Sequence, residues 1–135
     1  MAGAKSYQDL VAWQLAYELE RQVFARTATG HVAKDFAFCA QIRDASASAP
    51  RNIAEGFGCD THREFARFLE ISRRSLNELQ DCFQAALHHR FINNADLRPC
   101  RVLMTRLFPA MSRFIAYLDV TPDLPTRPRR ADSGK

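Results

Sequence analysis

Glycine is scarce in this sequence, cysteines never occur in close pairs, and no apolar run is long. Five of the 135 residues are glycine, against twenty alanines, a composition that favours helices over strands and tight turns. No apolar run approaches the roughly 18–20 residues of a membrane span. The opening MAGAKSYQDL also lacks the apolar segment of a signal peptide. We therefore expect a cytoplasmic helical protein with no membrane segment.

The four cysteines argue against a metal centre. They stand at positions 39, 59, 82 and 100, so no two are closer than eighteen residues. A structural zinc site usually includes at least one close pair of ligands, and a cytoplasmic location disfavours disulfides. We expect reduced thiols that pack as small apolar residues, with no metal and no cofactor.

Four segments have the spacing of amphipathic helices, separated by three short breaks. The predicted helices are 7–27, 33–56, 61–89 and 95–118. A length of 135 residues predicts a single domain, and a hydrophobic content of 47% predicts a soluble globular chain. We therefore predict an all-α, up-down-up-down four-helix bundle over 1–118. Residues 119–135 contain three prolines and no periodicity, and we expect them to be disordered.

The first predicted helix carries two apolar lines rather than one. The first line is Leu10, Trp13, Tyr17 and Phe24, and the second is Val11, Leu15, Leu19 and Val23. A helix in an isolated bundle needs only one such line. Deep burial and a contact with a second subunit both explain the surplus. Under the second alternative, the line from Val11 to Val23 is the predicted oligomer interface.

No residue pattern predicts catalysis. The serines have no histidine nearby in sequence, and His88 and His89 project about 100° apart on a helix, so they do not chelate one metal together. Neither the di-iron bundle spacing nor a glycine-rich phosphate loop occurs. We predict a protein that is not an enzyme.

The net charge of +4 is concentrated in the last predicted helix. Residues 94–118 contain four arginines and one acid, which gives +3, while the three preceding segments are neutral. The four arginines lie within about 140° on a helical wheel, opposite the apolar arc. Such a row can bind successive phosphates, or it can be a solvated face that meets acids of a neighbouring helix or subunit. The candidate nucleic-acid-binding residues are Arg98, Arg101, Arg106 and Arg113.

Residues 41–56 match every fixed position of a pattern close to Q-I-R-x-A-x-x-S-x-P-x-N-I-A-E-G. This stretch resembles the signature of the bacterial four helix bundle protein family, which includes proteins encoded in intervening sequences of ribosomal RNA genes. The resemblance extends over about 7–118, although Ala49 and Arg74 depart from the usual residues. Its polar and helix-shaping positions are Gln41, Arg43, Ser48, Pro50, Asn52, Glu55 and Gly56.

The resemblance implies a left-handed bundle assembled as a homopentameric ring. Some relatives are accessory variability determinants of diversity-generating retroelements, which bind nucleic acid and a reverse transcriptase. The signature itself is interpreted as structural: Pro50 kinks the helix, Gly56 ends it, and Asn52 and Glu55 bond across to the next helix.

Two functions follow from these observations. The leading hypothesis is a homo-oligomer that binds RNA or DNA through the arginine row, with a reverse transcriptase or another protein as a further partner. The rival hypothesis is a structural scaffold that recognises protein and has no nucleic-acid role.

Overall fold

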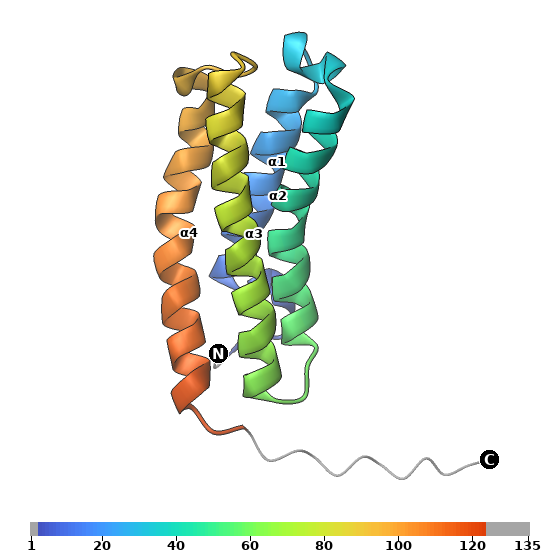
Figure 1. Cartoon of the computed structure of the whole chain (residues 1–135). Helices are drawn as coiled ribbons and strands as arrows, with labels where there is room; N and C mark the ends of the chain where they lie inside the picture. The colour runs from blue at the N-terminus through green and yellow to red at the C-terminus, as the bar shows by residue number, and fades with distance from the viewer. Residues whose placement is uncertain (1–2, 124–135) are drawn as a thin grey trace, which may run out of the picture.

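The computed structural model describes residues 3–123 and contains four long helices. They are α1 (Val11–Thr27), α2 (Phe36–Phe57), α3 (His62–His88) and α4 (Asn94–Val120). The helices run alternately up and down and stand side by side (Figure 1). Within 3–123 there is no strand, so the prediction of an all-α four-helix fold is confirmed. No helix in this range combines the length and hydropathy needed to cross a membrane.

The first two α-helices begin later than predicted, because a short 3-10 helix precedes each of them. Tyr7–Asp9 forms the first, and the Asp9 carboxylate accepts hydrogen bonds from the amides of Lys5 and Ser6 at 2.9 and 3.2 Å. His31–Lys34 forms the second. Asp35 then caps α2, since its carboxylate accepts from the Phe38 amide at 3.0 Å.

The starts of the other two helices follow local capping rules. The Thr61 hydroxyl accepts from the Glu64 amide at 3.2 Å, as the T-x-x-E spacing predicts. The Asn93 side chain accepts from the Asp96 amide at 2.8 Å. Both caps satisfy amides that have no partner within the helix.

Each helix packs against two neighbours and leaves one face to solvent. Helices α1 and α3 both contact α2 and α4, and the α2–α3 contact is the most extensive. The centre is filled by large side chains from all four helices that are at most 2% exposed. They include Leu19, Ile42, Ile53, Leu69, Leu76, Leu79, Leu107 and Met111.

The chain beyond α4 returns to the start of α3. Helix α4 continues two residues past the predicted end at 118. The Asp123 carboxylate then accepts from the His62 amide at 2.6 Å, and the His62 ring nitrogen Nδ1 lies 2.8 Å from the Thr121 carbonyl oxygen. The predicted tail therefore begins with an ordered turn. The rest of it, 124–135, lies outside the described residues.

Candidate nucleic-acid interface

The signature residues hold α2 against its neighbours, and Gly56 does so by being small. A Cβ atom at Gly56 would lie 2.5 Å from Cδ2 of Phe65 on α3. Gly56 is buried inside α2, which continues to Phe57. The prediction that Gly56 ends the helix was therefore wrong. The missing side chain at Gly56 instead allows α3 to approach α2 closely.

A hydrogen-bonded chain of side chains crosses from α2 to α3. Asn52 Nδ2 donates to the Ser48 carbonyl and hydroxyl oxygens at 2.8 and 3.0 Å. The hydroxyls of Ser48 and Ser75 lie 2.7 Å apart, and Ser75 donates to the Ile71 carbonyl at 3.1 Å. Ser48 is therefore the donor to Ser75, since a hydroxyl has one hydrogen. We expected Asn52 to bond directly to α3, and this was wrong. Asn52 instead bonds to Ser48, which is the residue that bonds to α3.

The remaining signature positions divide into inner and outer ones. Arg43 Nε donates to the Thr27 hydroxyl at 2.9 Å, and its guanidinium lies 4.8 Å from the centre of the Phe24 ring, which ties α2 to the end of α1. Pro50 is buried within the continuous helix α2. Gln41 and Glu55 are exposed, and within 3–123 Glu55 makes no ion pair and no bond to α3.

Of the two explanations for the second apolar line of α1, the structure supports deep burial. Leu15, Leu19 and Val23 are 8%, 1% and 2% exposed and lie in the bundle's own core. Of the predicted interface line, Val11 alone is exposed, at 60%. The structure therefore corrects the interface hypothesis. In the other line Leu10 is buried, and the three aromatic residues Trp13, Tyr17 and Phe24 form the outer part.

That outer line is an aromatic face shared by α1 and α2. Trp13 and Tyr17 stack with ring centres 4.8 Å apart. Tyr17 is 43% exposed and Phe24 is 40% exposed. On α2, Ala47 and Ala54 follow Arg43 at helical spacings of four and eleven residues, so they lie on the side of α2 from which Arg43 contacts Phe24.

The four arginines of α4 reach solvent without an acidic partner. Arg98, Arg106 and Arg113 are exposed, while Arg101 is half-buried and donates to the Asn94 side chain at 3.3 Å. In the part of the chain that the structure describes, no arginine of α4 forms an ion pair. The arginine pairs formed there are local ones within α1 and α3, Arg21–Glu18 and Arg73–Glu70.

The predicted row divides into two groups. Arg106 and Arg113 border a groove that Val11 lines from α1. Arg98 and Arg101 border a shallow hollow near the start of α4. Arg101 also lines the α3–α4 groove, which contains the acid Asp81. The helical wheel could not show this division, because it depends on which helix flanks each side of α4.

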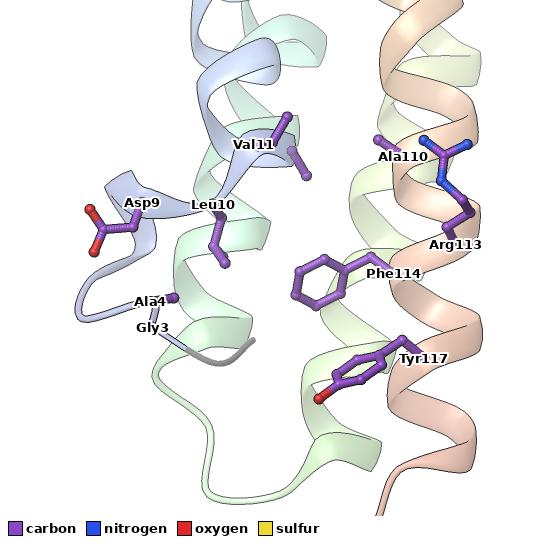
Figure 2. Close-up of a pocket in the computed structure, with 10 residues that line it drawn as sticks. Gly3, Ala4, Asp9, Leu10, Val11, Ala110, Arg113, Phe114 and Tyr117 are labelled. Atoms are coloured by element: carbon purple, nitrogen blue, oxygen red, sulfur yellow. The ribbon is translucent and has the colours of Figure 1, made fainter.

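An apolar hollow of about 680 Å³ lies between the start of α1 and the second half of α4. Figure 2 shows the ring of Phe114 projecting from α4 toward Leu10, and the ring of Tyr117 projecting to the same side of α4 one turn further along. The Asp9 carboxylate points away from this hollow and is engaged by backbone amides. The hollow is therefore lined mainly by apolar residues.

The cysteines are free thiols, as expected from their spacing. Cys39, Cys82 and Cys100 are buried, and burial raises the pKa of the Cys82 and Cys100 thiols. Desolvation, with nearby Glu64 and Glu55, raises the pKa of Cys59 as well. Protonated thiols are weak nucleophiles. Within 3–123, no three metal-ligating side chains gather closely enough to hold an ion.

These features define a four-helix bundle protein with a basic helix face and an aromatic helix face. The chain belongs to the family of 23S rRNA-intervening sequence proteins, whose model matches residues 8–112. The match includes the whole signature and three of the four α4 arginines, and it ends one residue before Arg113. No curated protein matches the chain.

Proposed function

We propose that this protein binds nucleic acid, without catalysing a reaction, through the solvent face of α4. The observation that carries the proposal is a helix face with four arginines and no acidic partner within 3–123. Arg98 and Arg113 are fifteen residues apart, about 22 Å along a helix. Guanidinium groups bind phosphate oxygens in bidentate fashion, and this length faces several successive phosphates.

The position of the acids supports this proposal over an internally neutralised face. Arg106 and Arg113 border a groove on the α1 side of α4, and the α1 residues that line this groove, Val11 and Leu15, are uncharged. Arg101 shares its groove with the acid Asp81. Asp9 lines the hollow that Arg113 borders, but its carboxylate accepts hydrogen bonds from the amides of Lys5 and Ser6. We therefore assign the main phosphate contacts to Arg98, Arg106 and Arg113, and a weaker one to Arg101.

We propose further that the protein is a homo-oligomer, in keeping with the pentamer that the family resemblance implies. The exposed aromatic face of α1 and α2 supports self-association, because monomeric proteins rarely leave such apolar surface in solvent. Five copies at +4 each would carry about +20, a field strong enough to attract a polyanion at long range.

Fluorescence anisotropy of labelled RNA and DNA, measured across a range of salt concentrations, tests nucleic-acid binding. Four phosphate contacts per chain give a slope of log Kobs against log salt of about −3.6 on duplex and about −2.8 on a single strand. Replacing the four α4 arginines by glutamine should remove most of the affinity and flatten the slope.

The matched control replaces four exposed arginines on other helices, so that it loses the same charge. Arg21, Arg51, Arg63 and Arg74 serve this purpose. The proposal predicts a much smaller loss for this control than for the α4 variant. Equal losses, or no salt-dependent binding by the wild-type protein, would overturn it and favour a protein-binding scaffold.

A further inference from the structure

Aromatic and cationic side chains gather where two loops meet at one end of the bundle. The loop between α1 and α2 contains the 3-10 helix His31–Lys34, and the loop between α3 and α4 contains His89–Asn93. Both loops lie at the same end, the top of Figure 1. Residues about sixty positions apart in sequence therefore meet there.

Phe91 is the centre of this cluster. The centre of the Phe91 ring lies 4.9 Å from the centre of the Phe38 ring. Phe38 packs against the core, so this contact restricts the movement of Phe91. The exposed imidazoles of His31 and His89 flank it at 5.4 and 5.5 Å. Phe91 is half-buried against the core, and the His31 and His89 rings are tilted at 53° and 35° to its ring. The three rings form a partly exposed aromatic cluster, here called the platform.

Arg90 occupies a backbone position that normally belongs to glycine. Helix α3 ends in a Schellman motif, in which the Phe91 amide donates to the Ala86 carbonyl at 2.9 Å and the Arg90 amide to the Leu87 carbonyl at 3.1 Å. Arg90 therefore adopts a φ of 58°. Within 3–123, no other residue except glycine has a positive φ. An arginine here is strained relative to glycine, and it places an exposed cation next to Phe91.

The charge around the platform suits an anionic ligand. Lys34, Arg90 and Arg98 are exposed and form no ion pair within the described residues. The carboxylate of Asp35 is engaged as the α2 cap, and Asp96 lies in the first turn of α4, where the helix dipole favours an acid. Arg98 lies in the second turn of α4, close in sequence to this loop, and also belongs to the arginine face of α4.

We infer that this loop end is a stacking site for the unpaired bases of a single-stranded nucleic acid. Bases stack on exposed aromatic rings regardless of sequence, while nearby cations bind the flanking phosphates. Bases within a duplex are already stacked and paired, so the platform discriminates against duplex. This inference rests on the proposed function and adds the class of nucleic acid bound.

The test compares three labelled probes of equal length: a single strand with all its bases, the same strand with several abasic positions, and a hairpin duplex. RNA and DNA versions of the first probe are both measured. The abasic strand keeps the phosphates and loses the stacking partners. We expect the wild-type protein to bind the complete strand about five- to tenfold more tightly than the abasic strand, the contribution of one stacked base.

Three changes in the platform examine its parts. Phe91→Leu keeps the apolar volume and removes the ring, and it should weaken binding of the complete strand about five- to tenfold while leaving the abasic strand unchanged. The double variant His31→Ala, His89→Ala should act in the same direction. Arg90→Gly should raise the melting temperature of the protein, because it relieves the backbone strain. It should also weaken binding of both the complete and the abasic strand, because it removes a cation. Phe57→Leu is the control, a half-buried phenylalanine at the other end of α2.

The outcomes separate this inference from the proposed function. If the complete and abasic strands bind equally well, or if Phe91→Leu matches Phe57→Leu, the stacking site is overturned while binding through α4 stands. If the wild-type protein binds no probe, both are overturned. A loss of binding by Phe91→Leu on the abasic strand as well would also contradict a stacking role.

Discussion

Cδ2 of Phe65 on α3 occupies the space that a Cβ atom on Gly56 of α2 would need, at a separation of 2.5 Å. Phe65 is itself 3% exposed and packs edge-on against Phe114 of α4, with ring centres 5.1 Å apart. The ring therefore has little freedom to move aside. One hydrogen atom at Gly56 in place of a side chain sets the spacing of α2, α3 and α4 at this end of the bundle.

Gly56→Ala should therefore destabilise the protein, although alanine is the better helix former. Forcing a methyl group into a packed interface typically costs about 1–3 kcal/mol, which exceeds the gain of about 1 kcal/mol in helix propensity. We expect a melting temperature lower by several degrees, measured by circular dichroism. Gly58→Ala is the control, since its Cβ would lie 3.5 Å from the nearest atom, an ordinary contact. Equal stability of the two variants would contradict this role of Gly56.

The serine chain between α2 and α3 makes a second stability prediction. Ser48→Ala removes the donor to Ser75, and we expect a loss of about 0.5–1.5 kcal/mol in urea unfolding. A double-mutant cycle with Ser75→Ala should show a coupling energy of similar size. Ser112→Ala, at an exposed position on α4, should change stability by less than about 0.5 kcal/mol. Additive effects of Ser48→Ala and Ser75→Ala would show that the hydroxyls do not interact.

The sequence could predict that helices form, but not which surface each one presents. On α1 both lines have helical spacing, so periodicity alone could not choose between Leu19 and Tyr17 for the core. The choice depends on shape and polarity. Leucine and valine fill the dense centre, while Trp13 and Tyr17 can remain half-exposed because each has a polar atom at its edge.

The arginine face was predictable and the loop platform was not. Arginine periodicity on α4 is local, because positions three to eight residues apart on a helix share a face. The approach of His31 to Phe91 is a contact between distant loops, and it depends on where α1 and α3 end. The clearest local signal was the His88-His89-Arg90-Phe91 run. This run indicates the end of a helix, but it does not predict which residues of the other loop contact Phe91.

Stability should also depend on pH through Glu20 of α1. Burial raises the pKa of this carboxyl above its usual value of 4.5, and the positive charge of Arg51 on α2 partly opposes the rise. Between the unfolded and the folded pKa, the folded state binds more protons, so the free energy of unfolding falls as pH rises. The stabilisation that the protonated group provides is complete below pH 4.5 and is lost above the folded pKa.

Glu20→Gln removes this dependence. The variant should melt at a higher temperature than the wild-type protein at pH 7, and the difference should shrink as the pH falls toward 4.5. Thermal melts at several pH values measure it. Glu78→Gln removes one negative charge at an exposed position on α3 and controls for net charge. If the increase in melting temperature at pH 7 persisted unchanged at pH 4, burial of the charged Glu20 carboxylate would not be its cause.

Self-association through the aromatic face is tested by placing a charge within it. Ala47→Glu puts a carboxylate beside the exposed rings of α1, where a second chain would have to bury it without a partner, and buried unpaired charges are strongly unfavourable. We expect the wild-type protein to sediment as an oligomer in analytical ultracentrifugation and the variant to sediment as a smaller species with unchanged helicity. Asn77→Glu, on the exposed side of α3, adds the same charge away from this face and should leave the oligomer intact. If Ala47→Glu leaves the sedimenting mass unchanged, the contact between chains lies on another surface. If the wild-type protein sediments as a monomer, the proposal of a homo-oligomer is wrong.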